Sequence, residues 1–318
     1  MHIVMNDGRK GPKTVIIAGI HGDEGLGVKV LEKLAETISQ KKILGELHLL
    51  LGNPEAYKKN VRYIDTDLNR LFNESHKDLS KLDNPNNEQK RAIEIGLLLR
   101  DANFLLDIHS TSKPSVPFLY IENSPKHKQL ASKFGIEMIV LQGKKFRPEE
   151  LFSSTDSFVD RCGGIGITYE SGWQKDFSSL DNVFENTLRF LSAVGTIDFV
   201  KHKKIDSLKQ YLEIYDCVVP LQKEFTFSSD YENFDFVPAN KTLAYEAGRP
   251  IIASEDSYII FPKKNIVINS PACCLAKKIG QNSGKKRKRS SILLLTAILS
   301  AKTWNKIKNF CPTIFWPQ

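Results

Sequence analysis

The sequence contains few cysteines and no cysteine motif. Their number is odd and no Cys-x-x-Cys pair occurs among Cys162, Cys217, Cys273, Cys274 and Cys311. This pattern suggests neither a cysteine zinc site nor a disulfide framework. We therefore expect reduced thiols.

Long apolar runs are also absent. The longest late run, residues 292–299, is far shorter than the roughly 20 residues that span a bilayer. Residues 1–13 lack the apolar segment of a secretory signal. These observations predict a cytoplasmic protein without a membrane span.

The body of the chain lacks a strong charge of one sign. The formal net charge is +8, but residues 281–318 hold eight Lys or Arg and no acid, so residues 1–280 are formally neutral. Because the basic charge belongs to the tail, we expect no nucleic-acid binding by the body. Basic charge beside an apolar stretch is also typical of membrane-surface elements. We favour the interpretation of residues 281–318 as a poorly ordered or non-native extension.

Apolar runs typical of buried parallel strands alternate with amphipathic helical patterns. The predicted strands are residues 14–20, 47–51, 104–109, 118–121, 138–141 and 165–170, and the predicted helices are residues 27–38, 88–100, 126–134 and 183–194. This alternation predicts an α/β fold, with a mainly parallel central sheet flanked by helices. We assign residues 1–200 to this domain.

Beyond residue 200 the pattern changes to short β-like runs separated by turn residues. These runs are residues 211–219, 251–253, 258–261 and 266–268. They predict a small all-β domain over residues 205–280.

Polar residues follow several of the predicted strands directly. His21 and Glu24 come after the first strand, and His109 and Glu170 end two later ones. Ligands of open parallel sheets bind beyond the carboxyl ends of the strands. Two histidines and one carboxylate form a common set of catalytic zinc ligands that leaves one position open. Alternatively, His21 is a loop histidine and Glu24 a first-turn helix acid, but the other two strand ends favour a zinc site.

Five motifs occur in order along the chain. They are His21-Gly22-Asp23-Glu24, Asn53-Pro54, the run from Arg62 to Arg70 (RYIDTDLNR), the run from Asp107 to Thr111 (DIHST), and Tyr169-Glu170. Together they resemble the succinylglutamate desuccinylase/aspartoacylase family, over about residues 14–195 and more weakly to about 280. The resemblance implies a zinc carboxypeptidase-like fold and one zinc ion per chain. It also implies hydrolysis of the amide bond of a small N-acyl amino acid.

The resemblance also implies roles for single residues. It makes His21, Glu24 and His109 the zinc ligands, and Glu170 the general base that activates the zinc-bound water. It assigns Arg62 to the developing charge on the carbonyl oxygen, Asn69 and Arg70 to a substrate carboxylate, and Asp67 to the orientation of His21. These roles agree with the chemistry of the groups, since a guanidinium binds carboxylates in a bidentate way and metal-bound imidazole needs a second partner.

The sequence departs from the family pattern in two places. Asp156 stands about where members with acidic substrates have an arginine, and Arg147 and Arg161 are the candidates to replace it. The segment 270–276 lacks the tyrosine of aspartoacylases and holds Cys273 and Cys274. We therefore predict a substrate with a carboxylate on its amino-acid part and a neutral or basic side chain, different from N-acetylaspartate.

Two other functions remain open. A zinc carboxypeptidase acting on peptides would share the catalytic residues, although in the resembling family the small β domain narrows the cleft to small substrates. A non-catalytic zinc-binding protein would be expected to lack Glu170 or Arg62, and both are present. A homo-oligomeric assembly is compatible with either function.

Overall fold

The computed structural model describes residues 1–38, 43–143, 153–198 and 208–280. Residues 1–279 group into one unit by their contacts. The predictions made for the tail 281–318 and for Arg147 lie outside the described residues. In the described part of the chain, no helix is both long and apolar enough to cross a membrane.

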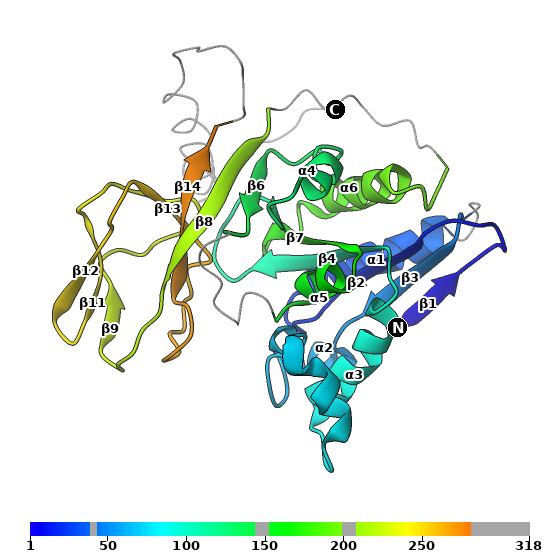
Figure 1. Cartoon of the computed structure of the whole chain (residues 1–318), viewed down its shortest axis with the longest axis horizontal. Helices are drawn as coiled ribbons and strands as arrows, with labels where there is room; N and C mark the ends of the chain where they lie inside the picture. The colour runs from blue at the N-terminus through cyan, green and yellow to red at the C-terminus, as the bar shows by residue number, and fades with distance from the viewer. Residues whose placement is uncertain (39–42, 144–152, 199–207, 281–318) are drawn as a thin grey trace, which may run out of the picture. The chain divides into compact units, whose positions relative to one another are not determined.

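Eleven strands form one sheet in the order β1-β3-β2-β4-β7-β5-β6-β8-β14-β13-β10 (Figure 1). The strands are β1 (His2–Met5), β2 (Lys13–Ala18), β3 (Glu46–Leu51), β4 (Phe104–Thr111), β5 (Phe118–Ile121), β6 (Met138–Leu141), β7 (Ile165–Trp173), β8 (Gln210–Val218), β10 (Phe236–Val237), β13 (Ser257–Ile260) and β14 (Cys273–Ile279). The predicted α/β fold with a large central sheet is confirmed.

The complete sheet is mixed, but its part within residues 1–198, for which a mainly parallel sheet was expected, has four parallel strand pairs and two antiparallel ones. Five strand pairs are parallel, β2–β3, β2–β4, β4–β7, β5–β6 and β6–β8. Five are antiparallel, β1–β3, β5–β7, β8–β14, β13–β14 and β10–β13. Parallel pairs need crossover connections, and the chain makes these mainly in its first half, where helices separate the strands.

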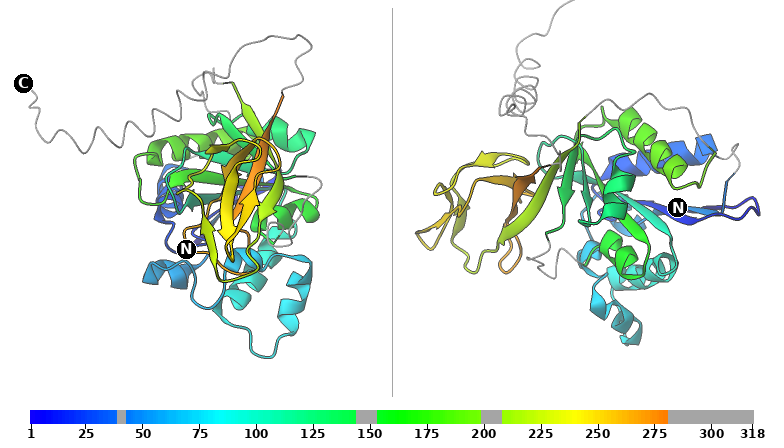
Figure 2. Two further views of the ribbon diagram at one scale, coloured as in Figure 1. Left: turned by 90° about the vertical axis from the view of Figure 1, so that its left-hand side faces the viewer. Right: turned by 45° about the horizontal axis from the view of Figure 1, so that its top comes forward.

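Helices cover both faces of the sheet (Figure 2). The helices α1 (Gly25–Ile38), α4 (Pro125–Ala131) and α6 (Leu180–Ala193) share one apolar core with Ile16 and Ile108. The helices α3 (Asn87–Leu99) and α5 (Thr155–Arg161) share the core of the opposite face with Val15 and Leu105. Because strand residues alternate between faces, Asp107 and His109 lie on the α3 and α5 face.

Short helices complete the region between β3 and β4. The helix α2 (Pro54–Lys59) begins with proline and is capped by the Asn53 side chain, which accepts from the Ala56 amide. Two 3-10 helices follow, η1 (Leu68–Arg70) and η2 (Glu74–Lys81). The later helix α3 starts with a capping box between Asn86 and Gln89.

The regular elements described in residues 210–279 are all strands. Of these, β8, β14, β13 and β10 continue the central sheet. A second sheet contains β9 (Phe225–Phe227), β11 (Thr242–Glu246) and β12 (Arg249–Ile252). Residues 266–268 are not a strand, contrary to expectation, since the chain turns there and Asn269 is in the left-handed region (φ 62°). A separate domain over 205–280 that caps the cleft stays a prediction.

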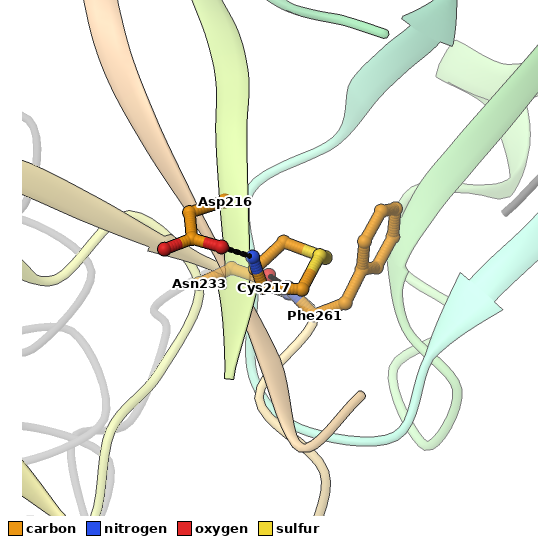
Figure 3. The surroundings of a disulfide bond; sticks show 5 residues. Asp216, Cys217, Asn233 and Phe261 are labelled. Carbon is orange, nitrogen blue, oxygen red and sulfur yellow. Dashed lines mark hydrogen bonds between the residues drawn. A yellow bond between two sulfur atoms is a disulfide. The ribbon is translucent and has the colours of Figure 1, made fainter. Parts of the chain in front are cut away.

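Cys217 and Cys274 form a disulfide between β8 and β14 (Figure 3). The expectation of reduced thiols is therefore wrong for this pair. The two residues are register partners in the antiparallel strand pair although 57 positions separate them in the chain. Cys162 and Cys273 are free, and burial raises the pKa of the Cys273 thiol to about 12.

Candidate active site and metal centre

The carboxyl ends of β2, β4 and β7 lie side by side. The register pairs Ala18 with Ile108 and His109 with Glu170, so residues far apart in the sequence meet at one edge of the sheet. The turn after β2 packs closely on α2, since a Cβ atom at Gly22 would lie 2.1 Å from the carbonyl carbon of Ala56. Only glycine fits this approach, which fixes the position of the turn.

His21, Glu24 and His109 form a buried cluster, with 4 %, 3 % and 5 % of their surface exposed. Nδ1 of His21 is 2.7 Å from Oε1 of Glu24, and Nδ1 of His109 is 3.1 Å from Oε2 of the same carboxylate. One donor atom from each residue lies within 4.8 Å of the others. The structure therefore brings the three predicted ligands together.

The second nitrogen of each imidazole faces another carboxylate. Nε2 of His21 is 3.1 Å from Oδ1 of Asp67, and Nε2 of His109 is 3.1 Å from Oδ2 of Asp107. A carboxylate at Nε2 favours the tautomer that leaves Nδ1 free to bind a metal. Asp67 was expected in this role, whereas Asp107 was missed. Asp107 stands two residues before His109 in the same strand, so the two side chains lie on one strand face. This spacing is the sequence signal that could have indicated the role of Asp107.

Charge is concentrated in this cluster. Burial opposes the ionisation of Glu24, yet His21 and His109 lower its pKa well below the usual range. Burial opposes the charged form of His109 too, but Asp107 and Glu24 raise its pKa well above the ordinary value. The Ser110 amide donates to Oε2 of Glu24 at 2.8 Å. Two imidazoles and a carboxylate, each oriented by further groups, are a donor set that fits a catalytic zinc ion.

Glu170 lies beside the cluster on β7 and is 8 % exposed. Among the described residues, its buried Oε2 atom has no hydrogen-bond partner. Burial raises the pKa of Glu170 to about 7, while nearby His109 lowers it and Glu24 raises it. A carboxylate with a pKa near the working pH is suited to general-base catalysis.

Arg62, Asn69 and Arg70 line the same cleft. The Arg62 guanidinium lies 3.7 Å from Oε1 of Glu24 and 3.2 Å from Oδ2 of Asp67, and its side chain is 42 % exposed. It thus has donors free to turn toward a ligand while it stays beside the cluster. Nη1 of Arg70 donates to the carbonyl oxygen of Asn69 at 2.9 Å, so the two residues form one corner of the cleft.

The first turn of α5 connects two parts of the site. The Thr155 hydroxyl donates to Oδ2 of Asp107, and the Thr155 amide donates to Oδ1 of Asn69 at 3.3 Å. Asp107 in turn faces His109. Thr155 therefore contacts both Asp107, which faces the candidate metal ligand His109, and Asn69, which is predicted to bind substrate.

The cleft has a volume of about 730 Å³ and also includes residues that were not expected to bind substrate. Asp156 and Thr168 line one part of it, and Lys263 and Lys264 come from the segment between β13 and β14. Arg161 is not among the lining residues, since it donates to the carbonyl oxygen of Phe72. Arg161 therefore does not replace the arginine that is missing near Asp156.

The fold is that of a known class of proteins. The model of the succinylglutamate desuccinylase/aspartoacylase catalytic domain matches residues 10–194, more than half of the chain. The chain belongs to the succinylglutamate desuccinylase/aspartoacylase family.

Individual relatives agree with this assignment. The chain is 25 % identical over 294 residues to the succinylglutamate desuccinylase of Shewanella putrefaciens, covering 84 % of this chain and 83 % of the relative. It is 27 % identical over 218 residues to a probable aspartoacylase of Acaryochloris marina, covering 64 % and 72 %.

Solved structures show the same fold. The succinylglutamate desuccinylase of Vibrio parahaemolyticus superposes with a TM-score of 0.72 at 19 % identity, covering 88 % of this chain and 86 % of that one. The product-bound ectoine utilization protein EutE (DoeB) of Ruegeria pomeroyi gives a TM-score of 0.66 at 20 % identity, with 88 % of each chain covered. A large central sheet flanked by helices is therefore common to these proteins and this chain.

Proposed function

We propose that this protein is a zinc-dependent deacylase that hydrolyses the amide bond of a small N-acyl amino acid. The observation that carries the proposal is the buried cluster of His21, Glu24 and His109, with the carboxyl of Glu170 beside it in one cleft. Membership of a family whose relatives are named desuccinylases and aspartoacylases supports the same reaction.

His21, Glu24 and His109 would hold the zinc ion, and Asp67 and Asp107 would keep the two imidazole rings in the required orientation. When bound, zinc supplies a Lewis acid that lowers the pKa of water and polarises a carbonyl group. Burial of the three ligands excludes bulk water, which strengthens the electrostatic interactions in the cluster.

Glu170 accepts a proton from the attacking water and then delivers it to the amide nitrogen of the departing amino acid. Burial raises the pKa of Glu170 in the metal-free protein, and burial thus favours the proton-accepting role of this carboxylate. Arg62 stabilises the negative charge that develops on the carbonyl oxygen.

Asn69 and Arg70 bind the carboxylate of the amino-acid part. A guanidinium forms strong charge-assisted hydrogen bonds with a carboxylate, and the arginine lies next to the carbonyl of Asn69. A substrate in which this carboxylate is replaced by a carboxamide should therefore be hydrolysed less efficiently.

The deciding experiment incubates the zinc-loaded protein with N-acyl amino acids, their carboxamides and short peptides, and measures the released amine. Release from N-acyl amino acids, with the carboxamides poorest, supports the proposal. Release from peptides alone would favour a carboxypeptidase, and no release at full zinc content would favour a non-catalytic zinc protein. The cytoplasmic location and the oligomeric state stay predictions.

A further inference from the structure

Glu88 is a buried carboxylate that the proposed reaction does not use. It is the second residue of α3, and 0 % of its surface is exposed. Oε1 accepts from the Ile64 backbone N–H at 2.7 Å and from Nδ2 of Asn53 at 3.0 Å. Oε2 accepts from the backbone N–H groups of Asp65 and Thr66 at 2.9 Å and 3.3 Å. One side chain therefore binds three successive amides of the segment between α2 and η1.

These hydrogen bonds stabilise the ionised form of Glu88. Burial opposes ionisation, yet the Asn53 side chain and the backbone amides of residues 64–66 lower the pKa of Glu88 below its ordinary value. Hydrogen bonds to an ionised acceptor are roughly twice as strong as those between neutral groups. Residues 64–66 lie in bends, outside helices and strands. The carboxylate thus provides these amides with the acceptors that a regular element would otherwise supply.

The segment that Glu88 binds carries a residue of the candidate site at each end. Arg62 stands before the three amides, and its guanidinium lies 3.7 Å from Oε1 of Glu24. Asp67 directly follows them, and its Oδ1 is 3.1 Å from Nε2 of His21. A displacement of the three amides would therefore move both side chains relative to the metal cluster.

Helix α3 is itself fixed to the edge of the sheet. Arg91, three positions after Glu88, donates from Nε to the carbonyl oxygen of Gly52 and from Nη2 to that of Leu51, both at 2.7 Å. Leu51 ends β3, which pairs in parallel with β2, the strand that precedes the metal cluster. Asn53 adds a second connection, since its Oδ1 caps α2 while its Nδ2 donates to Glu88. Glu88 thereby connects the segment to the sheet edge at which the candidate ligands lie.

Glu88 is not among the residues that line the cleft. We propose that Glu88 is a positioning residue, which holds residues 62–67 so that Arg62 faces the developing negative charge and Asp67 orients His21. Glu88 acts through Arg62 and Asp67 and contacts neither zinc nor substrate. This inference rests on the proposed deacylase function.

Glu88→Gln keeps the size of the side chain but replaces one acceptor by an amino group, which then faces backbone N–H donors. In the full-length, zinc-loaded protein, kcat should fall by about 10- to 100-fold, the range expected when a catalytic group is misplaced by about 1 Å. KM should change by less than about 3-fold, because Arg62 acts on the transition state and not on the bound substrate. The substrate is the N-acyl amino acid that the wild type hydrolyses fastest. The zinc dissociation constant, measured by chelator competition, should rise by about 10-fold.

Glu94→Gln is the matched control, because it makes the same substitution on the same helix. Glu94 pairs with Arg91 at 2.7 Å and its side chain is 64 % exposed, outside the cleft lining. The control should keep the kcat, KM and zinc affinity of the wild type. Equal losses in the control and in Glu88→Gln would overturn the inference, since loss of any charge from α3 would then have this effect.

Combined variants distinguish positioning from a general structural effect. With Arg62→Ala already present, Glu88→Gln should lower kcat by less than about 2-fold more, because the group through which Glu88 acts is gone. With Asp67→Asn already present, it should weaken zinc binding by less than about 2-fold more. Losses that multiply in either pair would overturn the inference. Circular dichroism establishes that each variant is folded.

Failure of the proposed function gives a different result, namely no hydrolysis by the wild type at full zinc content. The zinc affinities of Glu88→Gln, alone and with Asp67→Asn, then still test the inference. If Glu88→Gln does not fold, Glu88→Asp replaces it, since aspartate keeps the charge and both oxygens but is one methylene shorter. Hydrogen exchange of the wild type tests the bonds without any substitution. The amides of residues 64–66 should be protected, and exchange at the rate of an unfolded chain would overturn the inference.

Discussion

Substitution of Asp156 by Asn is expected to stabilise the folded protein only above mildly acidic pH. In the folded protein, burial raises the pKa of this carboxyl from its ordinary value of 3.8 to about 6. The folded state then holds the proton more tightly than the unfolded state does. Stability from this group is fully present below pH 4 and is lost as the pH rises toward about 6, because the buried group must ionise.

The size of the effect follows from the two pKa values. The difference between 3.8 and about 6 corresponds to about 3 kcal/mol of unfolding free energy above pH 7. Asparagine cannot ionise, so the variant avoids this loss. The free energy of unfolding of Asp156→Asn minus that of the wild type should rise by about 3 kcal/mol between pH 3 and pH 7.5.

Urea denaturation of both metal-free proteins at half-unit intervals of pH measures this difference directly. The comparison cancels the titrating groups that do not interact with Asp156, and a lost hydrogen bond would add only a constant offset. Asp7→Asn should show the opposite trend, because the Arg9 side chain lowers the pKa of the exposed Asp7. A difference for Asp156→Asn that does not change with pH would show that the carboxyl is not destabilised by burial.

Four further predictions concern the proposed metal centre and its surroundings. His109→Ala should lose zinc in metal analysis, and full retention would remove this residue from the ligand set. Glu170→Gln should keep zinc but lose at least about 10²-fold in kcat, so a nearly normal rate would assign proton transfer to another group. Asp107→Asn should weaken zinc binding by about 10- to 100-fold, as should Asp67→Asn, and chelator competition distinguishes this from unchanged affinity. Truncation after Gly280 should leave zinc content and hydrolysis unchanged, and an inactive but folded product would show that the tail contributes to the site.

The parts of the fold that the sequence predicts well are those where burial leaves a local pattern. The apolar run of β3, predicted as residues 47–51, is observed as Glu46–Leu51. The convergence of His21 with His109 was predictable because neighbouring parallel strands end at the same edge of a sheet. Apolar runs and the rule that parallel strands end at one edge of a sheet were thus sufficient to predict where the strands that carry the candidate ligands end.

Features that depend on pairing between distant segments were not predictable. Cys217 and Cys274 meet only because β8 and β14 align in register, and no local spacing indicates this. Asp107 interrupts an apolar strand and shows its role only once His109 is placed beside it. The antiparallel continuation of the sheet after β8 likewise depends on long-range pairing, which apolar runs alone do not specify.

The start of α5 has a consequence for how specificity can change in this chain. Through Thr155 the helix is bonded to Asp107 and Asn69, and the next residue, Asp156, lines the cleft. An insertion or deletion that displaced this turn would move Asp107, which faces the proposed metal ligand His109. It would also move Asn69, which is proposed to bind the substrate carboxylate. Neither of these bonds involves the Asp156 side chain, since the Thr155 hydroxyl makes one and the Thr155 amide makes the other. A point substitution at position 156 therefore leaves the bonds to Asp107 and Asn69 intact, whereas a change of loop length would displace both bonds.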